Sequence, residues 1–332
     1  MSSATVRGAD AKEFVKCFNG ICQWNNGWDR WNDMVNMFAI TIANTVDLNN
    51  REKREELYAH TAGKYKPEEL NRFAELFAVM VDAMERNPFQ DFLGQMYMEL
   101  NMGSKSHGQC FTPFSVCQLM VETAMPEEKI RQKLEEHGWI SINDCTCGAG
   151  AILIAAAERL HLMGVNYQRH ALFVAQDLDS TVAMMCYIQL SLLGCAGRVR
   201  IGDTLMNPDN SDVLMGDGKP NTWYMPMFYS DIWSGRVFAR YMDLLTRPKS
   251  AQRAPEAERP SENPPEEAQA PEPATECAEM ALECTKPEKN AQNTEENAQK
   301  EIESAAFILT TARRTKKSMS EGQLMFDLTG GM

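Results

Sequence analysis

The sequence predicts an α/β protein in which a helical region precedes a parallel sheet and an acidic segment follows it. Stretches typical of strands and of helices alternate between residues 138 and 202. Amphipathic helical patterns fill residues 11–100, and seven prolines crowd residues 248–273. Alternating strands and helices at this spacing are typical of parallel sheets with right-handed crossovers. The predicted parts are a helical domain (1–105), an α/β domain (106–247), a disordered acidic linker (248–304) and a basic, apolar tail (305–332).

Composition and charge set the broad class. The chain has 332 residues, of which 44% are hydrophobic and 24% charged, which is enough apolar material for a real core. The net charge is −13, but residues 248–304 hold 14 acidic and 6 basic residues and so contribute −8 of it. The overall charge therefore does not exclude a nucleic-acid-binding face on the folded part.

The location expected from the sequence is the cytoplasm. The first residues, MSSATVRGADAKEF, hold no apolar stretch of the kind found in secretory signals. No run approaches the roughly 18 to 20 apolar residues of a membrane helix, so no membrane partner is expected. The ten cysteines form no CxxC pair and the five histidines are scattered, so we expect reduced, mostly buried thiols and no metal site.

The helical region has two clear amphipathic patterns. VNMFAITIANTVDL (35–48) and residues 68–86 place apolar side chains at spacings of three and four. Pro67, followed by two glutamates, is typical of a helix start. Trp24, Trp28 and Trp31 also recur at helical spacing, a stripe that is more often a packing face than a platform for stacking bases.

The α/β region predicts three strands and two helices in alternation. Each strand is short, apolar and followed by a glycine or an acid, and each helix ends in a glycine. In chain order the elements are the strand GWISINDCTCG (138–148), the helix AILIAAAERLHLMG (151–164), the strand ALFVAQDLD (171–179), the helix STVAMMCYIQLSLLG (180–194) and the strand RVRIGDTL (198–205). After Asp203 the pattern weakens, leaving room for one irregular strand and a helix over 231–245.

The glycine-rich turn after the first strand is the strongest local signal for a binding site. Gly148 and Gly150 allow backbone N–H groups to approach a ligand closely, and the next helix begins there. Asp144 precedes the turn, and Asp177 ends the second strand, where an acid typically accepts hydrogen bonds from ribose hydroxyls. The alternative is a tight turn with an exposed aspartate. On the cofactor interpretation, the two cysteines beside the turn serve in packing.

Four ordered blocks carry a family resemblance that covers about residues 90–205. They are GQCFTPFSVCQLM (108–120), NDCTCGAGAILIAA (143–156), AQDLDSTVAMMCYIQLSLLG (175–194) and GDTL (202–205). They resemble the N6-adenine DNA methyltransferases, in particular the methylation subunit of type I restriction-modification systems. The resemblance implies a Rossmann-like class I methyltransferase core, truncated here, and S-adenosylmethionine as cofactor.

The resemblance also implies a role for eight residues. Phe111, Thr112 and Pro113 would line the methionine end of the cofactor. Asp144, Gly148 and Gly150 would form the turn around it. Asp177 would hold the ribose hydroxyls, and Asp203 would accept a hydrogen bond from the adenine amino group. Thr112 and Pro113 can equally start a helix, as N-cap and first helical residue, and the two roles are compatible.

The catalytic signature of the family, Asn/Asp-Pro-Pro-Phe/Tyr, is not found where it is expected. The nearest stretch is MPMF (225–228), so the candidates for the acceptor site are Asn221, Pro226 and Phe228. NPPE (263–266) lies in the predicted linker and has no aromatic residue after it. A complete fold of this kind needs about seven strands, so the half that shapes the base pocket is expected to be abbreviated.

The function predicted is S-adenosylmethionine-dependent methylation of adenine N6 in DNA, on an adenine flipped out of the duplex. The alternative is a catalytically degenerate cofactor- or DNA-binding subunit of a methylation complex. A third hypothesis is a methyltransferase whose acceptor is RNA or protein instead of DNA. The predicted partners are DNA and a specificity or complementing methyltransferase subunit.

Two signals in the tail have open interpretations. RRTKK (313–317) would contact phosphate or form a solvated patch. GQLMFDL (322–328) resembles peptides that bind sliding clamps, and its alternative is a terminal helix that folds back.

Overall fold

The computed structural model of the protein describes residues 8–21, 26–102 and 111–246. Trp24, the predicted linker (248–304) and the tail (305–332), with its RRTKK and GQLMFDL stretches, lie outside the described residues. None of the described helices is both long and apolar enough to cross a membrane.

Seven helices precede the first strand in the described part of the chain. They are α1 (Gly8–Gly20), α2 (Gly27–Ala43), α3 (Arg51–Gly63), α4 (Pro67–Arg86), α5 (Phe92–Glu99), α6 (Phe114–Ala124) and α7 (Glu127–His137). The helix predicted over 68–86 is confirmed as α4, with Pro67 in its first turn. The helix predicted over 35–48 ends earlier, at Ala43, where Asn44 is the C-cap and the chain turns: the Thr45 N–H donates to the Ile42 carbonyl and the Val46 N–H to the Ala43 carbonyl, each at 3.2 Å.

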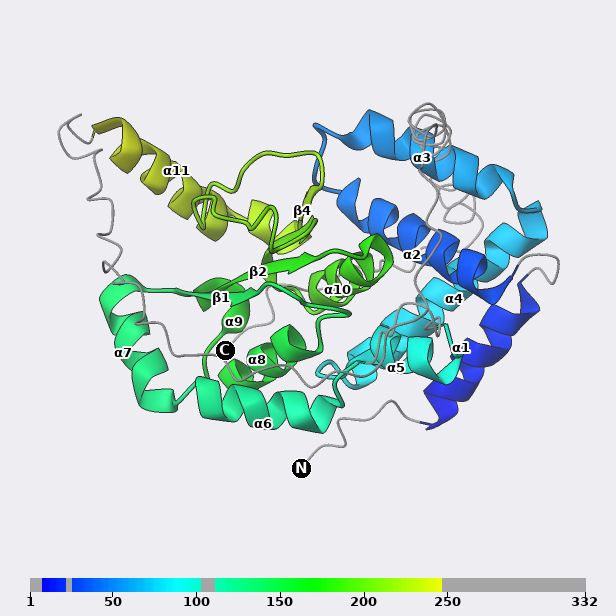
Figure 1. Ribbon diagram of the computed structural model, residues 1–332, viewed down its shortest axis with the longest axis horizontal. Helices are drawn as coiled ribbons and strands as arrows, with labels where there is room; N and C mark the ends of the chain where they lie inside the picture. The colour runs from blue at the N-terminus through cyan, green and yellow to red at the C-terminus, as the bar shows by residue number, and fades with distance from the viewer. Residues whose placement is uncertain (1–7, 22–25, 103–110, 247–332) are drawn as a thin grey trace, which may run out of the picture.

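The remaining elements form a small mixed sheet and its helices (Figure 1). In chain order they are β1 (Ile140–Asp144), α8 (Ala151–Leu162), α9 (Tyr167–His170), β2 (Ala171–Asp177), α10 (Ser180–Leu192), β3 (Ala196–Ile201), β4 (Thr222–Tyr224), the 3-10 helix η1 (Pro226–Tyr229) and α11 (Asp231–Thr246). The strands lie in the order β1-β2-β3-β4, with β1, β2 and β3 parallel. The predicted α/β class and its three alternating strands are therefore confirmed.

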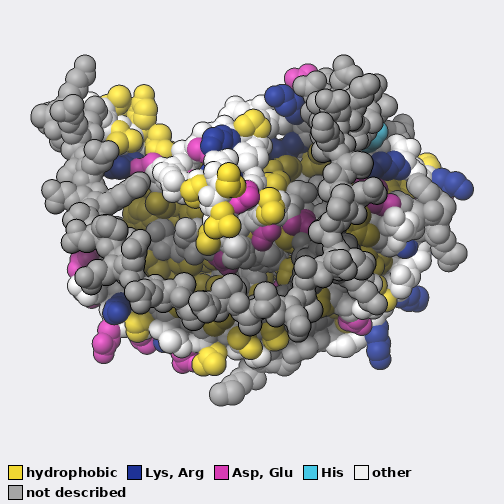
Figure 2. Space-filling model, in the orientation of Figure 1, with side chains coloured by type: hydrophobic (Ala, Val, Ile, Leu, Met, Phe, Trp, Pro, Cys, Tyr) yellow, Lys and Arg dark blue, Asp and Glu magenta, His cyan; other side chains and the backbone are white. Residues whose placement is uncertain are grey.

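The two faces of the sheet are covered differently. The register places Ile140 beside Ala171, and Ile142 beside Phe173, on the face that packs against α8 and α10. Leu172 points to the other face, where the buried Trp233 of α11 packs under it. α11 then extends away from the body of the molecule, and hydrophobic side chains are visible at the upper left of the space-filling view (Figures 1 and 2).

The N-terminal helices share one hydrophobic core with the sheet. α2 and α5 pack against α10, and the core cluster runs from α1 to Met225 without a break. Trp31 is fully buried in it, as the packing interpretation of the tryptophan stripe predicts. Trp28 departs from that prediction, because 43% of its surface is exposed.

β4 is a short strand whose position the sequence patterns did not specify. It pairs antiparallel with β3, at the edge of the sheet farthest from β1. Two buried arginines of β3 bind the connection between the two strands. Arg198 donates to Asp209 at 3.0 Å and to the Val213 carbonyl at 2.5 Å, and Arg200 donates to the Pro208 carbonyl at 3.3 Å. This connection carries β4 back onto β3.

The buried pair of Arg198 and Asp209 predicts an acid-sensitive contribution to stability. Burial raises the pKa of Asp209, but hydrogen bonds from Ser211 and Arg198 and the charge of Arg198 outweigh it, so the pKa is lowered overall. The stabilisation is therefore present above the unfolded pKa of about 3.9 and is lost as the pH falls through the lower folded pKa. We expect Asp209→Asn to cost about 1–2 kcal/mol at pH 7, and the melting-temperature gap to wild type to close below about pH 4.

Calorimetry from pH 7 to pH 3 tests this expectation. Glu135→Gln, on the exposed side of α7, is the control and should give no pH-dependent gap. A gap for Asp209→Asn that stays constant over the whole range would contradict the assignment of stability to the charged carboxylate.

Candidate functional site

The carboxyl ends of β1, β2 and β3 meet at one edge of the sheet, and a tight turn follows β1 there. The Cys147 N–H donates to the Gln176 carbonyl of β2 at 3.0 Å, and the Gly150 N–H donates to the Cys147 carbonyl at 2.8 Å. These bonds fold residues 147–150 back over the end of the sheet before α8 begins. The N-terminus of α8 and the N–H of Gly148 thus lie at the edge where parallel sheets bind ligands.

The two glycines of the turn are required for different reasons. Gly148 has φ +53° and Gly150 has φ +95°, both in the region that disfavours side chains. A Cβ on Gly150 would lie 2.9 Å from the sulfur of Cys186, which is too close. A Cβ on Gly148 would lie 3.4 Å from the ring of Phe111 and would fill space between that ring and the turn. Gly150 therefore allows the turn to pack, and Gly148 keeps its open side free.

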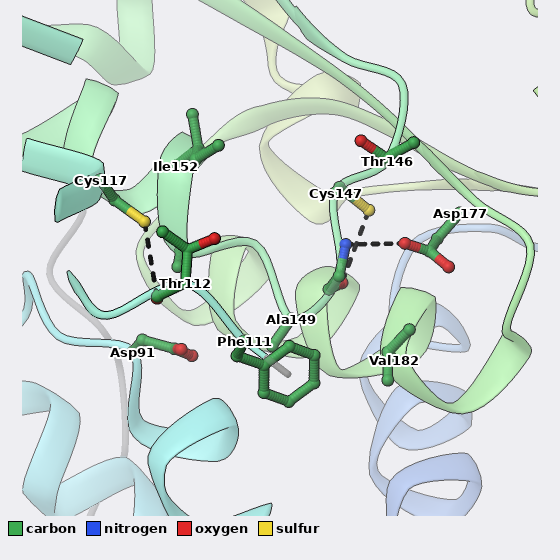
Figure 3. A pocket seen from close by; sticks show the side chains of 12 residues that line it. Asp91, Phe111, Thr112, Cys117, Thr146, Cys147, Ala149, Ile152, Asp177 and Val182 are labelled. Atoms are coloured by element: carbon green, nitrogen blue, oxygen red, sulfur yellow. Dashed lines mark hydrogen bonds between the residues drawn. The ribbon is translucent and has the colours of Figure 1, made fainter. Parts of the chain in front are cut away.

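Asp177 holds the turn from the end of β2. One carboxylate oxygen accepts from the Gly148 N–H at 2.8 Å, and the other accepts from the Asp179 N–H at 3.0 Å. Each carboxylate oxygen has two lone pairs, so both can accept a further hydrogen bond. Figure 3 shows this side chain beside the turn and the cavity next to it.

A cavity of about 210 Å³ joins the turn to the loop before α6. Gly148, Asp177, Phe111 and Thr112 are among the residues that line it. Figure 3 shows Asp177 on one side of the view and Thr112 across from it, with the ring of Phe111 between them. The apolar wall of the cavity includes Ile152 and Val182. A second cavity, of about 440 Å³, shares Phe111 and Thr112 with the first and is also lined by Pro113.

A buried polar clamp fixes the turn to the N-terminal helices. Gln189 of α10 is fully buried, and its amide nitrogen donates to the Ala149 carbonyl at 2.8 Å and to Asp91 at 2.9 Å. Its amide oxygen accepts from the Leu93 N–H at 2.9 Å. Burial raises the pKa of Asp91, against the hydrogen bonds from Gln189 and the Gly94 N–H. One side chain thereby connects α10, the start of α5 and the glycine turn.

Asp144 lies below the turn and does not line either cavity. One oxygen accepts from the Thr146 N–H at 3.1 Å, and the other is buried and has no partner among the described residues. Burial raises the pKa of its carboxyl; the Thr146 hydrogen bond opposes this, and the charge of Asp177 adds to it. The two cysteines beside the turn differ in exposure: Cys145 is exposed, and Cys147 is buried beside Cys186.

Asp203 and the three acceptor-site candidates lie apart from the cavity lining. The Asp203 carboxylate accepts from the N–H groups of Leu205 and Met206 in its own loop. The Asn221 side chain donates to the Ile201 carbonyl at the end of β3. Pro226 begins η1, and Phe228 packs with Trp233 on the opposite face of the sheet from α8. The structure thus brings Phe111, Thr112, Gly148 and Asp177 together at one cavity. Asp203 is outside its lining but close to it, because the Gly202 N–H donates to the Asp177 carbonyl and the Thr204 hydroxyl donates to the Cys145 carbonyl. The acceptor-site candidates lie at β4 and η1.

One predicted detail of the site is wrong by a residue. Thr112 is not the N-cap of the helix that follows, because α6 begins at Phe114 and Pro113 occupies the N-cap position. Proline fixes its own φ near the observed −54°, and it restricts Thr112 before it to non-helical angles. The side chain of Thr112 is therefore free of a capping bond and lines the cavity instead.

The sequence reasoning missed Asp91 and Gln189. A signal for each is present. Asp91 precedes a helix by one residue and has glycine three positions later, and its carboxylate accepts from the Gly94 N–H as an N-cap. Gln189 is a single amide within the apolar run of α10, and a polar group in such a run must find partners.

Comparison with known proteins gives one match. The family model described as N-6 DNA Methylase matches residues 89–233, a span that begins just before α5 and ends in α11. No curated protein and no solved structure matches the chain. The matched span contains the glycine turn, Asp177, the Phe111–Thr112 wall and both members of the Gln189–Asp91 clamp.

Proposed function

We propose that this chain, whose residues 89–233 belong to the N-6 DNA methylase family, binds S-adenosylmethionine in the cavity between Phe111 and Asp177 and acts in adenine-N6 methylation of DNA. The observation that carries the proposal is the convergence of the glycine turn, Asp177 and the Phe111–Thr112 wall on one cavity at the carboxyl edge of a parallel sheet. These segments are separated along the sequence, and a tight turn alone gives no reason for them to meet.

The chemistry of the cavity fits the cofactor. Asp177 offers acceptors for ribose hydroxyls, and Gly148 leaves room for a close backbone approach. Phe111, Ile152 and Val182 offer an apolar wall beside the Thr112 hydroxyl. When bound, S-adenosylmethionine supplies an electrophilic methyl group. The chain's own contribution would be to bind and orient it, because positioning accounts for much of the rate of such a transfer.

The roles proposed for Asp144 and Asp203 differ from that of Asp177. Asp144, with one buried oxygen that lacks a partner among the described residues, supports the turn from below. Both hydrogen bonds to the Asp203 carboxylate, from the N–H groups of Leu205 and Met206, fall on one oxygen, so the other oxygen would be the one to accept from the adenine amino group of the cofactor. The proposal therefore depends mainly on Asp177.

A second candidate function is a cofactor- or DNA-binding subunit that does not transfer the methyl group itself. The position of Asn221, Pro226 and Phe228 favours it, because none of them lines the cavity and Asn221 is bonded to the end of β3. A complementing or specificity subunit would then supply the acceptor site. Sliding-clamp binding through residues 322–328 stays a separate proposal for the tail.

Calorimetry with S-adenosylmethionine tests the proposed pocket. We expect Asp177→Ala to weaken binding by about 1–3 kcal/mol, the cost of a lost hydrogen bond to a charged group. Asp177→Asn keeps an oxygen acceptor and should lose less. Glu122→Ala, on the exposed side of α6, is the control and should bind as wild type does. Folded wild-type protein that binds no cofactor would contradict the proposal.

A methylation assay separates the two functions. Unmethylated plasmid is incubated with the protein and S-adenosylmethionine, and N6-methyladenosine is measured by mass spectrometry after digestion to nucleosides. Product from the wild type but not from Asp177→Ala would establish the enzyme. Cofactor binding without product would favour the non-catalytic subunit, and methylated RNA or protein would move the acceptor away from DNA.

A further inference from the structure

β1 is an open edge of the sheet within the described residues. It pairs with β2 on one side only, whereas β2 and β3 each have a strand on both sides. The sequence of β1, ISIND, contains no lysine or proline, and its pairing with β2 runs through all five residues without a bulge. In natural sheets, a lysine, a proline or a bulge in an edge strand usually prevents another strand from pairing with its free N–H and C=O groups.

The position of this edge is next to the cavity. Parallel α/β sheets bind ligands where the strand order reverses, in a crevice between two strands that continue in opposite directions. Here the order runs from β1 through β2 to β3 in a single direction. A strand on the free side of β1 would create that crevice beside Asp144 and the glycine turn.

α11 leaves a second surface uncovered on the same part of the molecule. Phe238, Tyr241, Met242 and Leu245 recur at spacings of three and four and are between 42% and 64% exposed. The start of α11 is anchored beside the amino end of β1. Trp233 contacts Trp139 with ring centroids 5.8 Å apart, and Arg236 donates to the Gly138 carbonyl at 3.4 Å. The start of α11 thus lies at the amino-end side of β1, and the helix runs from there to Thr246.

We propose that residues 305–311 of this chain, AAFILTT, add to the open edge of β1 as a parallel strand. They hold the longest apolar run after α11, and the β-branched and aromatic residues in them favour a strand. The 58 residues of 247–304 span at most roughly 190 Å when extended, far more than the length of α11, which is about 24 Å. Tethering also favours this occupant over a second copy of the chain.

Charge complementarity gives the direction of the added strand. Arg313 and Arg314 follow the segment directly. In a parallel strand they emerge at the carboxyl edge of the sheet, where Asp144 and Asp177 lie and where one buried oxygen of Asp144 has no partner among the described residues. In the antiparallel direction they would emerge at the amino end of β1, next to Arg236 of α11.

Hydrogen exchange on the full-length protein, followed by mass spectrometry, tests the proposal without any cofactor. Peptides covering β1 and residues 305–311 should both be protected in the wild type, at all protein concentrations and in a monomer. Ile308→Pro removes one N–H and should speed exchange in both peptides roughly tenfold or more. Asn297→Pro, in the polar stretch before the segment, is the matched control and should change neither peptide.

The other outcomes overturn the proposal. Protection of β1 that survives Ile308→Pro and increases with concentration would show that a second copy covers the edge. Rapid exchange of the outward amides of β1 in pure wild type would show that this chain does not cover it. Arg313→Glu/Arg314→Glu should also speed exchange, and unchanged protection would overturn the parallel direction. Failure of cofactor binding would leave each of these results unaffected, because the inference does not rest on the proposed function.

Discussion

Gln189→Leu is expected to cost about 3–5 kcal/mol of unfolding free energy, since each buried group left without a partner costs about 1–3 kcal/mol. The change removes both donors and the acceptor of the fully buried amide. It leaves the Ala149 carbonyl and the Leu93 N–H unpaired and takes one donor from Asp91. Leucine has a similar volume, so the loss comes from hydrogen bonding and not from a cavity. Chemical denaturation gives the value.

The same substitution should also weaken ligand binding, because Gln189 holds the carbonyl of the turn that lines the cavity. Gln118→Leu is the matched control. Gln118 donates to a single carboxylate, that of Glu158, but it lies on the partly exposed side of α6 and should cost less than about 1 kcal/mol. Equal losses for the two variants would contradict the view that the buried clamp, and not glutamine in general, stabilises the site.

Gly150→Ala is expected to destabilise the protein by about 2–5 kcal/mol, from left-handed strain of about 1–2 kcal/mol and steric overlap of about 1–3 kcal/mol. The strain follows from φ +95°, and the overlap follows from the 2.9 Å separation between the new Cβ and the Cys186 sulfur. We expect the turn to shift and ligand binding in the cavity to be lost with it. Thermal unfolding and calorimetry measure the two effects.

Two further variants separate strain from overlap. Gly164 has φ +73°, and a Cβ added there would meet no atom of the described residues within 4 Å, so Gly164→Ala should show the strain alone. Cys186→Ala removes the sulfur, so adding it to Gly150→Ala should recover the steric part, after correction for its own cost. A double variant as unstable as the sum of its parts would show that the sulfur is not what excludes a side chain at Gly150.

Local patterns in the sequence were sufficient to predict the alternating core. β2 is an apolar run that ends in Asp177, and α10 ends before Gly194. The hydrophobic periodicity and the residues that end each element therefore predict the same boundaries. The turn at Gly148 and Gly150 was also predictable, because only glycine is comfortable at such angles directly after a strand. These features depend on neighbours in the sequence, which is why they could be identified without a structure.

Features that depend on distant contacts were not predictable in this way. Asp91 and Gln189 are 98 positions apart, and neither sequence context specifies the other. β4 is only three residues long, and its place beside β3 depends on how Arg198 and Arg200 bind the preceding connection. The placement of Asn221 and Phe228 away from the cavity follows from that connection, so the acceptor-site candidates could not be located from their order alone.

The span of the Gln189 clamp also has a consequence for biosynthesis. Leu93 and Asp91 leave the ribosome before α10 exists, and 98 residues separate Asp91 from its partner. At about 5–20 residues per second, roughly 5–20 seconds pass between the synthesis of Asp91 and that of Gln189. During that time Asp91 and the Leu93 N–H lack the hydrogen bonds that Gln189 makes in the folded protein. Because α2 and α5 also bury apolar side chains against α10, the nascent chain exposes this apolar surface throughout that interval. A chaperone that binds apolar segments should therefore associate with ribosome-bound chains that stop before Ser180 more strongly than with chains long enough for Leu192 to have emerged from the ribosome.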